Sequence, residues 1–184
     1  MEEFSLYVLD ITMNSVRAGA NNIDITLKQD DEFLYVTIKD DGCGMTKEQV
    51  KKLEDPFFTT RKTRKVGLGI PFFTQLAEMT DGYVKIASKH ESEYEDHGTV
   101  IEGKFGYKHI DFIPLGDMPE TVTTLIQGSP DVDFTFTHTY GGKKVSLATS
   151  ELREILGSEI SLASVEILNW ISENLYEQYK ELNN

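Results

Sequence analysis

The sequence lacks the cysteines and the long apolar runs that mark secreted and membrane-spanning proteins. Its single cysteine, Cys43, cannot form an internal disulfide, and with four scattered histidines it matches no zinc-binding spacing. No apolar run approaches the roughly 20 residues that a membrane-spanning helix needs. The first residues, Met1 to Phe4, carry acid where a secretory signal carries basic residues. We therefore expect a cytoplasmic protein with no membrane partner.

Basic residues are scarce as well. The chain has 18 Lys and Arg against 31 Asp and Glu, which gives a formal net charge of −13. A surface of that sign repels phosphate backbones, so we expect no nucleic-acid partner. The remaining composition, 39% hydrophobic and 27% charged over 184 residues, is typical of one globular domain with room for a small appendage.

Two common phosphate-binding motifs are also missing. No G-x-x-x-x-G-K-[ST] run occurs anywhere, which excludes a P-loop. Gly42 and Gly44 begin a dinucleotide-binding fingerprint, but position 47, where its third glycine would stand, holds lysine.

Hydrophobic periodicity predicts alternating helices and strands. We expect helices over residues 4–18, 46–53 and from Gly69 to about 79, with strands over 23–27, 34–38, 83–88 and 99–107. Residues 54–66 read as an irregular basic loop. After residue 110 we expect a short helix near 120–127, a strand hairpin over 134–147 turning at Gly141-Gly142, and helices over 150–156 and 162–182.

Three groups of residues suggest chemistry. Asp10 and Asn14 lie one turn apart on the first helix, where a carboxylate can deprotonate water and an amide oxygen can bind Mg²⁺. The alternative is an ordinary solvated helix face. Asp41 with Gly42 and Gly44 ends a strand and would let the backbone approach a flat ligand, such as adenine. The alternative there is a tight turn with a solvated aspartate.

The third group is the segment from Asp55 to Gly69. It carries Arg61, Lys62 and two further basic residues before a glycine-rich helix start. Backbone amides at such a start form a phosphate site, and cations suit a triphosphate. The alternative is a basic surface loop before a capped helix.

The order of these segments resembles the GHKL superfamily, which includes DNA gyrase, heat-shock chaperones, histidine kinases and MutL. Residues 9–20 resemble its N box and residues 41–45 its first glycine box, while Asp55-Pro56-Phe57-Phe58 resembles its F box and Gly67-Leu68-Gly69 its second glycine box. The resemblance covers about residues 5–107. It implies an α+β fold, the two-layer Bergerat ATP-binding fold, with a mixed sheet and helices on one face.

The resemblance also implies roles for individual residues. Asn14 would bind Mg²⁺, Asp41 would accept a hydrogen bond from the adenine amine, and Thr99 would support Asp41. Phe57 and Phe58 would anchor a lid from which Arg61 or Lys62 reaches the phosphates. The full set of expected ATP-binding residues is Asn14, Asp41, Gly42, Gly44, Met45, Phe57, Phe58, Thr60, Arg61, Lys62, Gly67, Leu68, Gly69 and Thr99.

Asp10 stands where hydrolytic members of that superfamily carry the glutamate that activates water. Two functions follow. In the first, the protein binds Mg-ATP and hydrolyses it slowly or transfers a phosphoryl group to a separate protein partner, with Asp10 as the catalytic base. In the second, it is a regulatory module whose ATP-ordered lid switches a partner contact.

The last third of the chain resembles no family. We therefore divide the sequence into an ATP-binding domain over residues 1–109 and a small α+β C-terminal region over residues 110–184. Trp170, Tyr176 and Tyr179 on the last helix present either a partner surface or, as the spacing favours, a face that packs against the hairpin.

Overall fold

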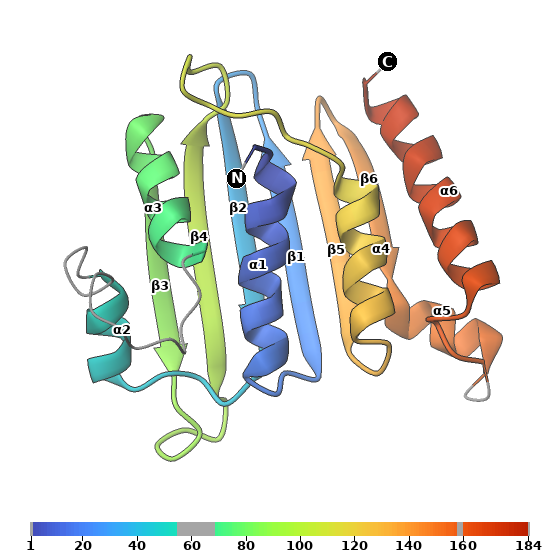
Figure 1. Cartoon of the computed structure of the whole chain (residues 1–184), viewed down its shortest axis with the longest axis horizontal. Coiled ribbons are helices and arrows are strands. Elements are labelled where there is room, and N and C mark those ends of the chain that lie inside the picture. Colours follow the sequence, from blue (N-terminus) through green and yellow to red (C-terminus); the bar gives the residue numbers. More distant parts are fainter. Residues whose placement is uncertain (1, 55–68, 158–159, 184) are drawn as a thin grey trace.

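A single six-stranded sheet organises the chain (Figure 1). The computed structural model describes residues 2–54, 69–157 and 160–183. The strands lie in the order β3-β4-β2-β1-β5-β6. Their bounds are β1 Asn22–Gln29, β2 Phe33–Asp40, β3 Tyr83–Lys89, β4 Gly98–Gly106, β5 Asp133–Tyr140 and β6 Lys143–Ala148.

The sheet is mixed because one strand pair is parallel. β1 runs antiparallel to β2 and parallel to β5, with Ile25 opposite both Ile38 and Phe136. The pairs β2–β4, β3–β4 and β5–β6 are antiparallel. The predicted β5–β6 hairpin is confirmed: Gly141 and Gly142 both have positive φ, 58° and 79°, as a two-residue primed turn requires.

The helices cover one face of this sheet (Figure 1). Strand residues alternate between a buried and a more exposed position, as in β2, where Leu34, Val36 and Ile38 are buried. The predicted α+β fold with helices on one face is therefore confirmed. The helices are α1 Phe4–Arg17, α2 Lys47–Glu54, α3 Gly69–Met79, α4 Met118–Gly128, α5 Thr149–Leu156 and α6 Val165–Asn183.

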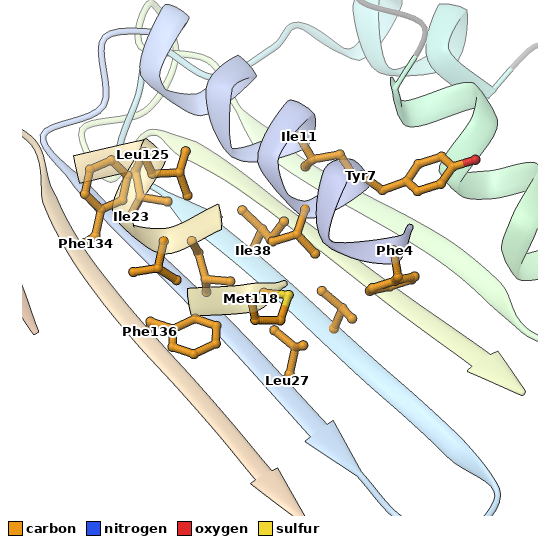
Figure 2. Close-up of a cluster of buried hydrophobic side chains, with 14 of the residues drawn as sticks. Phe4, Tyr7, Ile11, Ile23, Leu27, Ile38, Met118, Leu125, Phe134 and Phe136 are labelled. Atoms are coloured by element: carbon orange, nitrogen blue, oxygen red, sulfur yellow. The ribbon is translucent and has the colours of Figure 1, made fainter. Parts of the chain in front are cut away.

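The core lies between α1, α4 and the central strands (Figure 2). Phe4 and Ile11 from α1 are fully buried, as is Met118 at the start of α4. Phe4 also contacts Phe105 edge to face, with ring centroids 4.9 Å apart. Each buried side chain of this size contributes about 1.5–3 kcal/mol through the hydrophobic effect, so this layer fixes α1 on the sheet.

The residues after 109 extend the same sheet. β5 adds to β1 along seven residue pairs, and β6 and α6 continue outward from there. On α6 the Tyr179 hydroxyl lies 2.9 Å from His138 Nδ1 on β5, which confirms packing against the hairpin for that residue. Trp170 and Tyr176 are 51% and 41% exposed. In the described part of the chain, every helix is too short or too polar to cross a membrane.

Candidate functional site

The C-terminal half of α1 carries the two residues that the sequence predicted to act together. Asp10 and Asn14 are both half-buried and lie one turn apart. The helix ends just beyond them: the Ala18 N–H donates to the Asn14 carbonyl at 2.9 Å, and Gly19 follows with a φ of 75°. This is the C-terminal glycine that the sequence predicts. The helix therefore ends beside its polar face.

Gly69, the first residue of α3, lies against Asp10. A Cβ atom added at Gly69 would lie 1.9 Å from Asp10 Oδ2, far inside van der Waals contact. Only glycine lets the start of α3 approach the Asp10 carboxylate this closely. The structure thus joins the predicted second glycine box to the predicted catalytic base.

Asn14 has one free polar end. Its Oδ1 accepts a hydrogen bond from Arg17 Nη1 at 3.0 Å, while its Nδ2 is buried and has no hydrogen-bond partner among the described residues. The Oδ1 atom keeps a second lone pair beside the Arg17 hydrogen bond, which can bind a cation, and the free Nδ2 can donate to an acceptor such as a phosphate oxygen. A buried polar group without a partner is costly unless a ligand satisfies it. The residue therefore fits a cation site.

The side chains around Asn14 suit a Mg²⁺ ion that takes most of its ligands from a nucleotide and water. No group of three His, Cys, Asp or Glu side chains gathers within residues 2–54, 69–157 and 160–183. Mg²⁺ commonly takes one or two protein oxygens and completes its shell with phosphates and water. Asn14 fits as such a single protein ligand to a nucleotide-bound Mg²⁺.

A buried carboxyl group closes β2 on the helix-covered face. Asp40 is 8% exposed, and its Oδ2 accepts a hydrogen bond from the Ser15 hydroxyl of α1 at 2.6 Å. Its Oδ1 accepts from the backbone N–H groups of Gly42 at 3.0 Å and Thr99 at 3.2 Å. These bonds tie Asp40 to α1, to the glycine turn and to β4.

Asp41 points to a different place. Its Oδ1 accepts from the backbone N–H groups of Asn21 and Asn22 at 2.7 and 2.9 Å, and its Oδ2 accepts from the Asn22 side chain at 2.7 Å. Partial burial favours a higher pKa, but the hydrogen bonds from Asn22 and Asn21 outweigh it and lower the pKa of Asp41. Thr99, expected beside Asp41, donates instead to Asp40, so the predicted pairing is corrected.

Period-2 alternation is the signal that separates the two acids. Leu34, Val36 and Ile38 face the core, so the same alternation places Asp40 inward and Asp41 outward. Asp40 also begins a D-x-G-x-G spacing with Gly42 and Gly44. Both signals make Asp40 a candidate for the ligand-binding acid beside the predicted Asp41.

The glycine turn after β2 is bonded to two distant segments. The Cys43 N–H donates to the carbonyl of Ala18, just after α1, at 2.9 Å, and the Met45 N–H donates to Ser88 Oγ of β3 at 2.8 Å. Gly44 has a φ of 67°, and a Cβ there would lie 1.8 Å from Lys89 O. The turn is thus positioned by the protein itself, with Gly44 required where it crosses β3.

Two further residues at this end had no signal in the sequence. Ser88 Oγ lies 2.8 Å from Thr99 Oγ1, and His97 Nδ1 lies 2.6 Å from the Gly42 carbonyl. Both residues come from the β3–β4 hairpin and reach the glycine turn across more than 40 residues of sequence. Local periodicity does not predict contacts of that range.

A hollow of about 980 Å³ opens beside these residues. Among its lining residues are Asp40, Asp41, Thr99, and Lys47 and Lys51 of α2. Asp10 and Asn14 are not among the lining residues described, so the hollow lies between the end of β2, the β3–β4 hairpin and α2 rather than against α1. Seven predicted site residues lie outside the described residues: Phe57, Phe58, Thr60, Arg61, Lys62, Gly67 and Leu68.

The first part of the chain matches a known protein family. Residues 3–108 match the family described as histidine kinase-, DNA gyrase B- and HSP90-like ATPase. Sporulation kinase E of Bacillus subtilis is 33% identical over 96 residues, which is 50% of this chain and 12% of the kinase. A probable C4-dicarboxylate sensor kinase of the same organism is 30% identical over 77 residues, which is 42% of this chain and 14% of that kinase. The chain thus matches only a small part of each relative.

Two solved structures share the fold beyond the matched family region. The Aquifex aeolicus MutL ATPase domain, complexed with ADP, superposes with a TM-score of 0.55 at 17% identity over 85% of this chain and 68% of that chain. The N-terminal domain of a DNA repair protein superposes with a TM-score of 0.57 at 16% identity, over 86% of this chain and 58% of that chain. Such coverage extends past residue 108, so the shared fold includes part of the C-terminal region. By its matched residues and its fold, the chain belongs to the histidine kinase-, DNA gyrase B- and HSP90-like ATPase family.

Proposed function

We propose that the protein binds Mg-ATP between α1 and the end of β2, and then hydrolyses it slowly or transfers a phosphoryl group to a separate protein. The observation that carries this proposal is the buried carboxyl group of Asp40, which accepts hydrogen bonds from the Ser15 hydroxyl and the Thr99 backbone N–H. Ser15 directly follows Asn14, whose side-chain Nδ2 has no partner among the described residues. Burying a carboxyl group costs free energy, and a buried carboxyl group with an unused acceptor position at the end of a strand suits ligand recognition.

In this proposal Asp40, in place of Asp41, accepts the hydrogen bond from the adenine amine. A carboxylate has about four acceptor positions on its two oxygens. Protein donors occupy three of them in Asp40. One position is therefore left for an exocyclic amine. Asp41 also accepts three hydrogen bonds, from Asn21 and Asn22, and it differs from Asp40 in being half-buried beyond the end of β2 rather than buried on the helix-covered face.

The reacting end of the nucleotide would lie along α1. Asn14 would hold Mg²⁺, which neutralises phosphate charge and orients the phosphates. Asp10, next to Gly69, would accept a proton from the attacking water or protein hydroxyl. Arg61 and Lys62 would reach the phosphates from the lid, with Phe57 and Phe58 as its anchors. Thr60, Met45, Gly67 and Leu68 would complete the nucleotide contacts.

A regulatory module without useful turnover is the second candidate. The observation that favours it is the aspartate at position 10, whose side chain is one methylene shorter than a glutamate and half-buried on α1. The relatives named above are kinases, and this chain matches 12–14% of their length. In the first candidate a separate protein would supply the phosphate acceptor, and in the second it would read the ATP-bound state.

The family match ends at residue 108, which supports a nucleotide-binding unit over residues 1–109. Residues 110–184 would then serve the partner or a second ligand, although they share the sheet. We place the protein in the cytoplasm, where ATP is supplied.

Calorimetric titration with Mg²⁺ and a non-hydrolysable ATP analogue tests the proposal. We expect saturable binding that weakens when Mg²⁺ is omitted and that the matching GTP analogue does not reproduce, because guanine lacks an amine at the position that Asp40 reads. Equal affinity for both analogues would contradict the assigned pocket. Turnover measured on the same preparation then separates the enzyme from the regulatory module.

A further inference from the structure

A second cavity lies at the end of the sheet opposite Asp40. The ends of β1, β5 and α6 that line it lie at the end of the sheet where Figure 1 marks both chain termini. Its volume is about 600 Å³, which is within the usual range of small-molecule sites. The end of β1, the end of β5, the start of α4 and the last turns of α6 form its walls. Its lining residues are Gln29, Tyr107, Leu115, Gly116, Asp117, Pro119, His138, Tyr140, Tyr176, Tyr179 and Leu182.

Tyrosine dominates these walls. Four of the eight tyrosines of the chain line the cavity: Tyr107, Tyr140, Tyr176 and Tyr179. They come from three separate parts of the sequence, because Tyr176 and Tyr179 both lie on α6, and the three parts meet only in the folded protein. Aromatic rings offer apolar area together with negatively polarised faces, which attract cations. The walls therefore suit a ligand with an apolar body and a positive charge.

The charge of the cavity is negative, which also favours a positively charged ligand. Asp117 is the one charged side chain among the described lining residues. It accepts hydrogen bonds from the Glu120 N–H at 2.8 Å, as the N-cap of α4, and from the Tyr176 hydroxyl. The hydrogen bond to the Asp117 carboxylate raises the pKa of Tyr176 to about 12, so the hydroxyl stays protonated. The carboxylate also fills the helix terminus where an anion would otherwise bind.

His138 adds a polar group without adding charge. It is 1% exposed, and burial lowers its pKa to about 4, which leaves the imidazole neutral at pH 7. Its Nδ1 is bonded to the Tyr179 hydroxyl, while its Nε2 is buried without a hydrogen-bond partner among the described residues. Since a hydroxyl can donate or accept, the pair can leave a lone pair on Nε2. A neutral imidazole in that state accepts a ligand N–H or O–H.

The adjoining surface is acidic as well. A shallower hollow shares Gln29, Tyr140 and Leu182 with the cavity and adds Asp30, Asp31 and Lys143. The Lys143 ammonium already donates to the Glu181 carbonyl at 2.9 Å. Two carboxylates against one bonded lysine give the approach to the cavity a negative potential, which attracts cations and repels anions.

We propose that this cavity binds a small organic cation, an ammonium group on an apolar body, with the Asp117 carboxylate and the tyrosine rings around the charge. The site lies at the far end of the sheet from Asp40 and shares no described lining residue with the hollow there. It is therefore independent of the nucleotide function proposed above.

Choline and its neutral isostere 3,3-dimethylbutan-1-ol form a matched pair of probes, because they differ in charge but hardly in shape. We expect choline to bind the full chain at least about tenfold more tightly in calorimetric titration, the size of one desolvated cation–π contact. The ring resonances of His138 and of the four cavity tyrosines should shift in NMR spectra. Equal affinity for the two probes would overturn the proposal. So would the absence of binding at about 50 mM choline, a concentration that detects even weak ligands.

The variant Asp117→Asn isolates the charge. Asparagine caps helices as well as aspartate does, so α4 should remain folded. We expect choline affinity to fall about tenfold, with the affinity for the neutral isostere unchanged. The control is Asp131→Asn, an exposed aspartate between α4 and β5 that does not line the cavity. An equal loss in both variants, or shifts confined to resonances outside the cavity, would contradict the assigned site.

Discussion

The two ends of the sheet each bury a polar side chain on the helix-covered face, but they satisfy it differently. Asp40, at the end of β2, accepts three hydrogen bonds from Ser15, Gly42 and Thr99. His138, in β5, has a single partner, the Tyr179 hydroxyl, among the described residues. A carboxylate stays charged in the interior only when donors surround it, whereas an imidazole can lose its charge.

This difference predicts different behaviour. The Asp40 end is held by bonds to α1 and β4, so its geometry is set before a ligand arrives. The His138 end depends on protonation, because burial lowers the pKa of the imidazole and disfavours its charged form. Substitutions at the Asp40 end should therefore change nucleotide binding and turnover, while those at the His138 end should change the pH dependence of stability.

The largest effect is expected from Asp10→Asn. Removing a general base costs about 100-fold or more in turnover. The side chain keeps its size, so the approach of Gly69 is preserved and ATP affinity should stay within about threefold. Steady-state ATPase or phosphotransfer assays, with calorimetry for affinity, test this. Unchanged turnover would remove Asp10 from the reaction, and Asp131→Asn serves as the isosteric control at an exposed position.

The second prediction concerns His138 and pH. Its pKa is about 4 in the folded protein and 6.5 in the unfolded chain. The unfolded state binds more protons between these values, so the stabilising contribution is complete above pH 6.5 and is lost as the pH falls toward 4. Between pH 7.5 and pH 5 we expect a loss of about 2 kcal/mol in the free energy of unfolding.

Urea unfolding of the wild type and of His138→Gln at both pH values separates this contribution from that of the carboxyl groups. Glutamine does not titrate in this range, so the variant should lose less stability than the wild type by about 2 kcal/mol. An identical pH dependence of the two proteins would show that His138 is not buried in the neutral form.

A smaller effect is expected at Ser15. Ser15→Ala removes the hydroxyl that donates to Asp40 and leaves a buried acceptor without that partner, which costs about 1.5 kcal/mol. Thr12→Val is the matched control on the same helix, because the buried Thr12 hydroxyl has no hydrogen-bond partner among the described residues. That change should be neutral or stabilising. Equal losses in the two variants would mean that the Ser15–Asp40 bond contributes nothing.

The smallest effect is expected at Asn22. Asn22→Ala removes one side-chain hydrogen bond to Asp41 at an exposed site, and its cost should be about 0.5 kcal/mol. The Asp41 pKa should rise toward its ordinary value, measurable by NMR titration. Nucleotide affinity should not change, and a large loss would return Asp41 to the adenine pocket.

Much of the fold was predictable because its signals are local. Alternation of apolar residues predicted β1, β2 and the β5–β6 hairpin, and Gly19 predicted the end of α1. The parallel pairing of β5 with β1 was not predictable, since it joins strands more than 100 residues apart. The same limit hid the bonds of Ser88 and His97 to the glycine turn.

The choice between Asp41 and Asp40 depends on two conflicting signals. The glycines and the acid next to them favour Asp41, whereas the strand alternation through Ile38 favours Asp40 by placing it inward. The tyrosine cavity lay beyond any local pattern, because β1, α4, β5 and α6 each supply part of its wall. The spacing on the last helix singles out Tyr176 and Tyr179, but their neighbours Tyr107 and Tyr140 come from other parts of the chain.

The most direct test compares Asp40→Asn with Asp41→Asn in calorimetric titration with Mg²⁺ and a non-hydrolysable ATP analogue. Asparagine at position 40 places an amide N–H₂ group where a full acceptor is needed, so affinity should fall by about 100-fold. At position 41 the affinity should stay within about threefold. Circular dichroism of both variants confirms that they fold. The reverse order, with Asp41→Asn the weaker binder, would contradict the assignment of the nucleotide site to Asp40.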